Sequence, residues 1–234
     1  MLIDRKSLEV VRVASTEPSR FAINGVQIEP DGTAVATNGK SLMVVQGTAA
    51  DPAEYPEQAG EQVEIKEGGL ILDADHIKQI VKIIPRKKNT LDILKHVALV
   101  KGNNGHVTFA SWDGIAQQCA AHALEGTFPR YREVIPPLNK KDKTICLSVS
   151  SLRKILEAAG RMMDDEHDAV EISFSTSSKP AVLRFKLDRD RRALAVTMPM
   201  SVKDEDYYAI SDWEEKIAGW KKKKEEEKKE KKGK

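Results

Sequence analysis

Histidine is the side chain most often used for metal binding and for acid–base chemistry, and the five histidines here favour neither. His76, His96, His106, His122 and His167 are dispersed, with no His-x-x-x-His or His-x-Glu spacing of the kind found in zinc sites. The sequence also lacks the glycine-rich phosphate-binding motifs and the Gly-x-Ser-x-Gly motif of a nucleophilic serine. These observations predict a protein that is not an enzyme and that needs no cofactor or metal.

The only dense group of possible metal ligands is Asp164-Asp165-Glu166-His167-Asp168. Such a cluster could hold a divalent cation. It directly follows a helical pattern over residues 150–160, which favours a solvated turn instead.

Several features predict a soluble, cytoplasmic protein. Cys119 and Cys146 lie in strand-like apolar stretches without Cys-x-x-Cys spacing, which favours free thiols in a reducing compartment over a disulfide. The first residues lack the apolar region of a signal peptide, and no apolar run reaches the roughly 18 residues of a membrane span. We therefore expect no membrane association.

Basic residues lie on three predicted helices and could contact phosphates. The chain carries 38 Lys and Arg against 36 Asp and Glu, so a nucleic-acid surface would need these charges to be sorted onto one face. An amphipathic helix also keeps its charges away from its apolar stripe without binding anything, and that alternative stays open. The candidate DNA-binding residues are Arg5, Arg12, Lys78, Lys82, Arg86, Lys87, Lys88, Arg153 and Lys154.

The elements that would position these residues follow one pattern three times. Each unit is predicted to contain a short strand, a helix that begins at a capping Asp or Ser, and three further strands. The predicted caps are Asp4 in the first unit, Asp73 or Asp75 in the second, and Ser148 or Ser150 in the third. The predicted helices cover residues 4–14, 73–84 and 150–160. The predicted strands cover residues 1–3, 21–28, 33–37 and 41–45, then 69–72, 97–100, 106–111 and 115–123, and finally 144–149, 170–174, 181–187 and 193–200. Asp31-Gly32 and Asn38-Gly39 predict two hairpin turns.

A stiff connector separates the second unit from the third. Residues 126–137 contain three prolines, and the spacing of Phe128, Tyr131 and Val134 would let an extended segment attach itself to the bodies beside it. An ordinary proline-rich loop is the alternative.

Three strings in this chain resemble the bacterial sliding-clamp family, the β subunit of DNA polymerase III. Residues 128–136, Phe-Pro-Arg-Tyr-Arg-Glu-Val-Ile-Pro, are similar to the family's connector between its second and third domains. Residues 36–42, Ala-Thr-Asn-Gly-Lys-Ser-Leu, and residues 196–200, Val-Thr-Met-Pro-Met, resemble two further family strings in the same order. The resemblance covers about residues 1–202.

The resemblance implies an α+β sliding-clamp fold, in which two β-α-β-β-β units make one domain with two helices under curved antiparallel sheets. Residues 1–127 would then be a complete domain, 128–137 the connector, 138–202 a half domain and 203–234 a helical or disordered Lys/Glu-rich tail. The helices would line a ring around duplex DNA and contact its phosphates weakly and without sequence preference. The family's full chains carry three domains, so the third unit is expected to need a second copy, giving a dimer or a tetramer. The alternative is that residues 203–220 fold back over its exposed flank and leave a monomer.

The resemblance also implies a pocket for peptides of DNA polymerase or other clamp-binding proteins, and a possible clamp loader as a further partner. The pocket residues carried over by motif are Thr37, Gly39, Lys40, Ser41, Leu42, Pro129, Glu133, Val134, Val196, Met198, Pro199 and Met200. Lys40, Ser41 and Glu133 depart from the family's residues, which implies altered specificity.

The tail leaves a second function open. Ile210, Trp213, Ile217 and Trp220 have helical spacing, and the Lys/Glu run after them is either solvated or part of a docking segment. The rival hypothesis is a clamp-fold interaction or regulatory module that no longer encircles DNA and works through this tail.

Overall fold

The computed structural model describes residues 1–17, 21–48, 50–56, 61–85, 90–102, 106–112, 119–121, 123–136, 143–163, 168–201 and 211–218. They divide into two compact units, Met1–Ile135 and Pro136–Lys234, and the boundary falls inside the predicted connector. Among the helices described, none combines the length and apolarity needed to cross a lipid bilayer.

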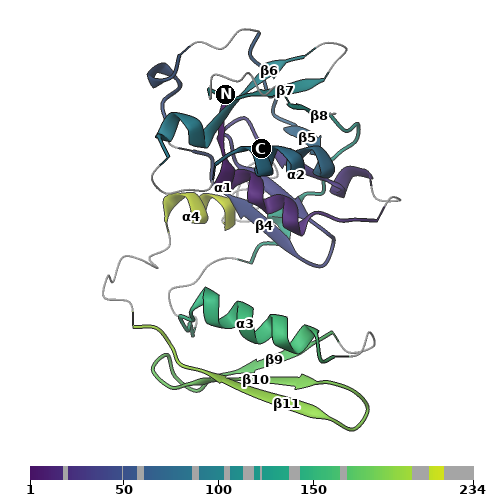
Figure 1. The fold of residues 1–234 in the computed structure, drawn as a ribbon, viewed down its shortest axis with the longest axis vertical. Coiled ribbons are helices and arrows are strands. Elements are labelled where there is room, and N and C mark those ends of the chain that lie inside the picture. The colour runs from purple at the N-terminus through teal and green to yellow at the C-terminus, as the bar shows by residue number, and fades with distance from the viewer. Residues whose placement is uncertain are drawn as a thin grey trace, which may run out of the picture. The chain divides into compact units, whose positions relative to one another are not determined.

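The first unit contains two β-α-β-β-β repeats (Figure 1). The first repeat is made of β1 (Leu2–Asp4), α1 (Arg5–Leu8) with a 3₁₀ turn at Glu9–Val13, β2 (Gly25–Ile28), β3 (Ala34–Thr37) and β4 (Leu42–Val45). The second repeat is made of β5 (Leu70–Asp73), α2 (Ala74–Ile83), β6 (His96–Lys101), β7 (Val107–Ala110) and β8 (Cys119–Ala121). Further 3₁₀ turns cover Phe21–Ile23, Pro52–Glu54, Asp92–Lys95 and Tyr131–Glu133.

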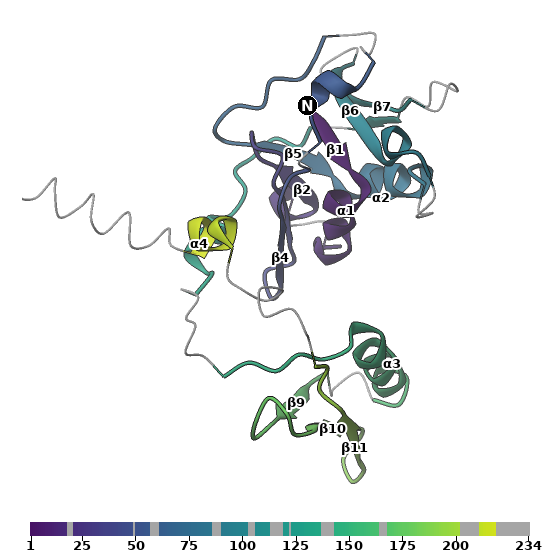
Figure 2. The same ribbon diagram turned by 90° about the vertical axis from the view of Figure 1, so that its left-hand side faces the viewer.

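The two repeats exchange their first strands. One antiparallel sheet has the order β1-β6-β7-β8 and the other has the order β4-β3-β2-β5, so each sheet takes one strand from the other repeat. The helices α1 and α2 contact each other and lie side by side (Figure 2). One apolar core holds residues from both sheets and both helices, including Ile3, Val26, Leu72 and Val97. Neither repeat therefore completes a sheet or a core alone.

Asp4 is confirmed as the first helix cap, and of the predicted alternatives the structure uses Asp73 and Ser148. Asp4 accepts a hydrogen bond from the Ser7 N–H (2.8 Å), and Asp73 accepts from the N–H groups of Asp75 (2.9 Å) and His76 (3.1 Å). Ser148 accepts from Ser151 N–H at 3.3 Å. Each side chain satisfies a backbone donor that the first helical turn leaves unpaired, which fixes where the helix begins.

Two predicted elements of the first repeat differ in the structure. The helix expected over residues 4–14 is α-helical only to Leu8 and continues as a 3₁₀ turn that contains Val10, Val11 and Val13, β-branched residues with a lower α-helix propensity. The strand expected from Phe21 begins at Gly25. A Cβ on Gly25 would approach Leu72 O to 2.7 Å, so a glycine is needed where β2 meets β5.

The second unit carries the third repeat. The helix α3 (Val149–Gly160) packs on an antiparallel sheet of order β11-β10-β9, formed by β9 (Val170–Ser173), β10 (Ala181–Lys186) and β11 (Arg192–Thr197) (Figure 1). Its core contains Ala159, Leu183 and Phe185, with Leu152 and Ile155 partly buried beside them. The helix α4 (Asp212–Ala218) follows in the chain.

The strand predicted over residues 144–149 is wrong. Leu147 forms one isolated antiparallel bridge with Pro199, and α3 already begins at Val149. Pro199 has no N–H to donate, so the pairing of this segment with the chain after β11 is reduced to this bridge and one bond beyond it, from Met200 N–H to Cys146 O at 2.9 Å. β11 accordingly ends at Thr197 rather than at Met200 as predicted.

Candidate nucleic-acid and peptide interface

The side chain of Arg5, a predicted DNA-binding residue, is engaged within the first unit. Its guanidinium donates to the carbonyl oxygens of Val81, in the last turn of α2, and of Ile84, the residue that follows the helix. It also pairs with Glu9 at 3.0 Å, and only 15% of the side chain is exposed. Arg5 thus caps the carboxyl end of α2, where a positive charge is favourable.

Three other predicted basic residues lie within reach of carboxylates. Arg12 pairs with Glu9 at 2.6 Å, Lys78 with Asp75 at 2.8 Å and Arg153 with Glu157 at 3.6 Å. Burial alone would raise the pKa of Glu9, but hydrogen bonds and charge from Arg12 and Arg5 outweigh it and hold that pKa below its usual value. The hydrogen bond from Lys78 likewise lowers the pKa of Asp75. These pairs reduce the positive charge that each helix offers.

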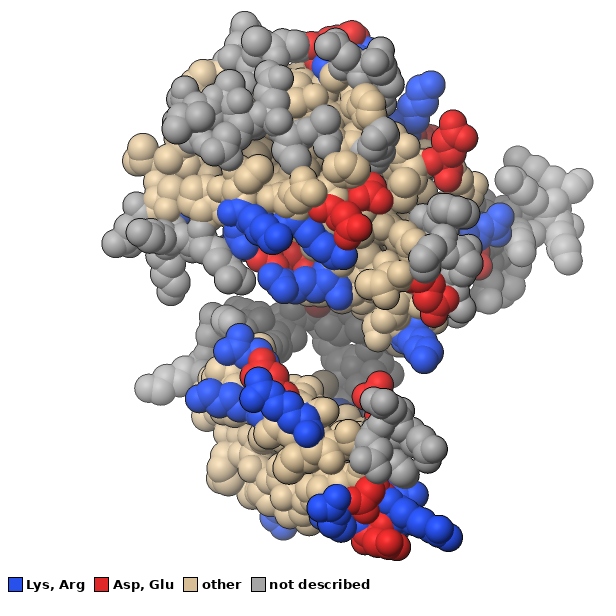
Figure 3. Space-filling model, turned by 45° about the vertical axis from the view of Figure 1, so that its right-hand side comes forward, with Lys and Arg blue, Asp and Glu red and all other residues tan. Residues whose placement is uncertain are grey.

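Two predicted residues remain available for phosphate contact. Lys82 on α2 and Lys154 on α3 are exposed, and within the described part of the chain no acidic partner is recorded for either. Lys6 on α1 is also exposed and was not among the predicted site residues. Arg86, Lys87 and Lys88 lie outside the described residues. Figure 3 shows blue basic groups beside red acidic groups on one face of each unit.

The predicted turn at the tip of the β3–β4 hairpin is built by its own polar side chains. Thr37 Oγ1 donates to Ser41 O (2.7 Å) and accepts from Gly39 N–H (3.0 Å). Asn38 Oδ1 accepts from the N–H groups of Lys40 (2.9 Å) and Ser41 (2.7 Å). Gly39 has φ of 86°, a conformation that favours glycine. The exposed Lys40 thus stands on a fixed turn.

The connector is attached to the first unit next to this hairpin. Phe128 and Tyr131 are buried in a small apolar cluster with Val35 and Ile71, and Leu42 packs against it. The structure therefore brings Leu42 and the connector string together. Pro129 is exposed, and Val134 is 71% exposed, so both remain on the surface. Glu133 lies 3.7 Å from Arg130.

A buried polar group holds the connector in place. Tyr131 OH donates to Glu29 Oε1 at 2.8 Å, and Arg132 pairs with the other oxygen of Glu29. Burial, supported by the Glu29 carboxylate, raises the pKa of Tyr131 far above its ordinary value, so the phenol stays protonated and donates. Sequence reasoning missed Glu29, which lies 102 residues before Tyr131 and carries no local signal.

The remaining predicted pocket residues belong to the second unit. Val196 and Met198 are exposed on the face of the sheet opposite to α3, because Ala193 and Ala195 alternate with them and pack toward the helix. Met198 is 66% exposed, Met200 is also exposed, and Pro199 is half-buried. These residues form an apolar surface that no described part of this unit covers.

No group of three or more His, Cys, Asp and Glu that could hold a metal occurs among the described residues. Residues 164–167 of the acidic cluster, the side chain of Cys119 and all of His122 lie outside them. Cys146 is a free, half-buried thiol. The His96 ring is hydrogen-bonded through Nδ1 to Tyr55 OH (2.8 Å) and through Nε2 to Thr48 Oγ1 (3.0 Å), so this histidine has a structural role.

No family model matches the sequence, and no curated protein is similar to it. Solved structures do match. The β sliding clamp of Caulobacter crescentus superimposes with a TM-score of 0.58 at 19% identity, over 85% of this chain and 50% of that one. The sliding clamp of Pseudomonas aeruginosa superimposes with a TM-score of 0.59 at 14% identity, again over 85% of this chain and 50% of that one. The sliding clamp of Bacillus subtilis superimposes with a TM-score of 0.55 at 14% identity, over 85% of this chain and 48% of that one.

This chain has the sliding-clamp fold. It spans about half the length of the clamps that it matches. The predicted fold class is confirmed, and the resemblance to the sliding clamps is confirmed at the level of the fold.

The clamp fold and the contacts of Arg5 lead to a separate prediction for that residue. Arg5→Ala should lower the free energy of unfolding by about 1–3 kcal/mol, because the last carbonyls of α2 lose a partly buried charged donor. Duplex DNA affinity, compared at equal folded fraction, should stay unchanged. Chemical denaturation and a DNA titration check the two halves of this prediction. An unchanged free energy of unfolding together with weakened DNA binding would instead support the prediction that Arg5 contacts DNA.

Proposed function

We propose that this chain is a clamp-like processivity factor: a cytoplasmic protein without enzymatic activity that holds duplex DNA and tethers a DNA polymerase or another replication protein. The observation that carries the proposal is the clamp fold itself, whose helices α2 and α3 each present an exposed lysine, Lys82 and Lys154. Lysine contacts to phosphates give sequence-independent, salt-sensitive binding, which suits a protein that slides. A homo-oligomer, dimer or tetramer, and a loader that places it on DNA complete the proposal.

A topological experiment tests this function. The full chain is incubated with a nicked circular duplex, the complex is isolated at rising salt, and the DNA is then cut once. An encircling protein stays on the circle at high salt and slides off the linear product. Equal loss from circular and linear DNA at every salt concentration would show contact without encirclement.

One observation favours the rival, a clamp-fold interaction or regulatory module. Arg5, Arg12, Lys78 and Arg153 are all engaged by carbonyls or carboxylates, which reduces the net positive charge that the helices offer to DNA. If the chain shows no DNA affinity even at low salt yet still binds peptides, the rival is correct.

We further propose that peptide capture uses the apolar surface around Val196 and Met198 and, on the first unit, the surface of Leu42, Pro129 and Val134. Thr37, Gly39, Lys40, Ser41, Glu133, Pro199 and Met200 complete the proposed set. The support is exposure of Met198 and Val134 without a described cover, and the adaptability of methionine to related apolar peptides.

Met198→Ala should weaken the binding of a short apolar clamp-docking peptide by roughly 1–3 kcal/mol, because the buried area of one large side chain is lost. Fluorescence anisotropy with a labelled peptide measures it. Met43→Ala is the matched control, since Met43 is an exposed methionine whose neighbour Leu42 points to the opposite face of β4. Equal affinities of both variants and the unaltered chain would move the site elsewhere.

A further inference from the structure

The strand exchange in the first unit follows one geometric rule. The residue just before each helix cap pairs with an inward-facing residue near the start of the other repeat's second strand. Ile3, before the cap Asp4, is opposite Val97, and Leu72, before the cap Asp73, is opposite Val26. All four side chains are buried in one core. The rule works in both directions, so the two repeats complete each other symmetrically.

The third repeat copies the second at the same positions. Leu72 forms an isolated bridge with Ala123, and Leu124 N–H donates to Ile71 O at 2.8 Å. In the third repeat Leu147, before the cap Ser148, bridges Pro199, and Met200 N–H donates to Cys146 O at 2.9 Å. Residues 144–147 therefore occupy the place of β5 relative to their own repeat. In the second repeat, the backbone of Leu72 also pairs on its other side with β2. The corresponding side of the Leu147 backbone has no partner among the described residues of its unit.

The complementary surface of the third repeat is also uncovered. β9 is the end strand of its sheet, and all its residues are exposed. Val170 and Ile172 are opposite Phe185 and Leu183, so they lie on the α3 side of the sheet, yet they are 38% and 46% exposed. Of the apolar residues at helical spacing on α3, namely Leu152, Ile155, Leu156 and Ala159, only Ala159 is buried. The corresponding residues of the second repeat, Ile77, Ile80, Val81 and Ile84, are all buried.

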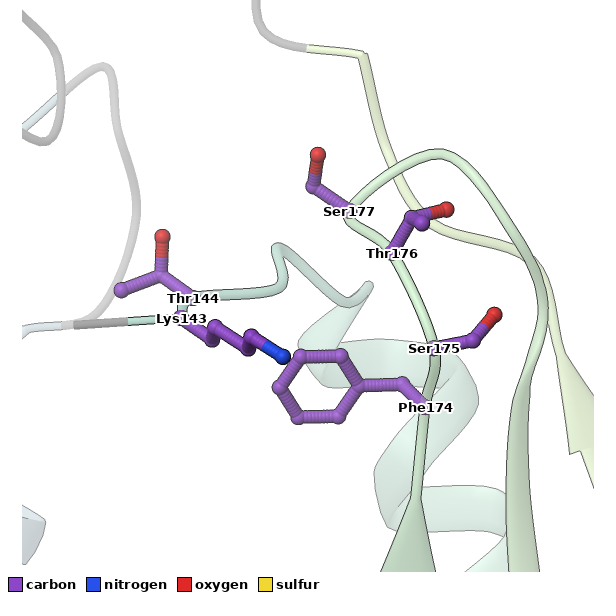
Figure 4. A pocket seen from close by; sticks show the side chains of 6 residues that line it. All are labelled: Lys143, Thr144, Phe174, Ser175, Thr176 and Ser177. Carbon is purple, nitrogen blue, oxygen red and sulfur yellow. The ribbon is translucent and has the colours of Figure 1, made fainter. Parts of the chain in front are cut away.

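No described segment of the second unit covers residues 144–147, β9 and the exposed apolar residues of α3. The core of the second unit includes no residue of α4. A cavity of about 370 Å³ lies between the start of the 143–147 segment and the chain that follows β9. Figure 4 shows the Lys143 side chain extending toward the Phe174 ring, with the hydroxyls of Ser175, Thr176 and Ser177 on the neighbouring loop. The two uncovered segments thus end at an open space.

We propose that the third repeat is completed by the third repeat of a second copy of this chain. Residues 144–147 of each copy pair antiparallel with β9 of the other about a two-fold axis, so that two half domains make one clamp-like domain. The occupant is a second copy because each half carries both parts of the exchange seen between repeats one and two, and a two-fold contact uses both at once. An exposed edge strand supplies the backbone donors and acceptors. This assembly does not depend on DNA binding.

The pairing rule of the first unit also predicts the register between residues 144–147 of one copy and β9 of the other. Leu147 of one copy is opposite Val170 of the other, since both side chains then face the joined core. Cys146 is consequently opposite Glu171, with the two Cα atoms at a separation that a disulfide can bridge. This register converts the inference into a cross-linking test that uses the natural thiol.

Glu171→Cys in the full chain, oxidised without DNA, should give a covalent dimer that a reducing agent reverses. Two controls should give none: the same substitution combined with Cys146→Ser, and Arg189→Cys, an exposed position in the loop between β10 and β11 and not on β9. Light scattering of the unoxidised full chain should report a dimer at tens of micromolar. A monomer at that concentration overturns the proposal, and so does a dimer in which Cys146 and Cys introduced at 171 do not cross-link.

Ile172→Lys provides a second test, because it places a charge in the joined core and should abolish the dimer. Ser173→Lys puts the same charge on the same strand with the side chain on the opposite face, and the dimer should persist. Circular dichroism checks that both variants are folded; since Ile172 is already 46% exposed in the single chain, folding is expected to survive. A dimer that tolerates Ile172→Lys is held by another surface. If the chain forms the dimer but does not bind duplex DNA, the proposed function is contradicted and this assembly is not.

Discussion

Lys82→Glu combined with Lys154→Glu should weaken the binding of every duplex sequence by more than about tenfold and flatten its salt dependence. Both lysines are exposed on helices and have no acidic partner among the described residues, so they carry free positive charge. Each lost phosphate contact should reduce the slope of log affinity against log salt by about 0.9. Fluorescence anisotropy with two unrelated duplexes across a range of salt concentrations measures both effects.

The matched control is Lys179→Glu combined with Lys186→Glu, which changes the net charge equally. Lys186 lies on the exposed side of β10 and Lys179 in the turn before it, so neither is on a helix. An equal loss of affinity in both double variants would mean that net charge, and not the helix surface, governs binding. Lys78 and Arg153 are less informative targets, because replacing either also releases Asp75 or Glu157 from its ion pair.

Tyr131→Ala should lower the free energy of unfolding of the first unit by about 3–5 kcal/mol. The ring is buried against Phe128, Val35 and Ile71, and its hydroxyl donates to Glu29, so truncation leaves a cavity and removes a buried hydrogen bond. The connector should then detach from the sheet. Denaturant unfolding followed by circular dichroism gives the stability, and limited proteolysis near residue 130 reports the detachment.

Tyr131→Phe separates packing from hydrogen bonding in the same place. It keeps the ring, and Arg132 still pairs with Glu29, so the loss should be only about 1 kcal/mol. If Tyr131→Ala and Tyr131→Phe destabilise equally, the polar group and not the apolar cluster holds the connector. If neither has an effect, the connector is not anchored through Tyr131.

The three-fold pattern of elements was readable from sequence because it depends on local chemistry. Asp4, Asp73 and Ser148 mark helix starts by accepting backbone hydrogen bonds a few residues away, and Gly32 and Gly39, with φ of 80° and 86°, mark the hairpin turns. The apolar stripe of α2 has helical spacing and is buried as predicted. The places where local reasoning failed are those set by a partner: Gly25 against β5, and the bridge of Leu147 with Pro199.

The candidate DNA-binding and peptide-binding residues also depend partly on local sequence and partly on the fold. The sequence by itself determined which residues could serve, because residue type and order carry the three clamp-like strings and the basic helices. Only the tertiary structure decided which of them are available: Arg5 turns onto the end of α2, Glu29 reaches the connector from 102 residues away, and β9 lies at a sheet edge. The physical reason is that capping, turns and periodicity act over a few residues, whereas burial, ion pairing and strand exchange depend on segments that meet only when the chain has folded.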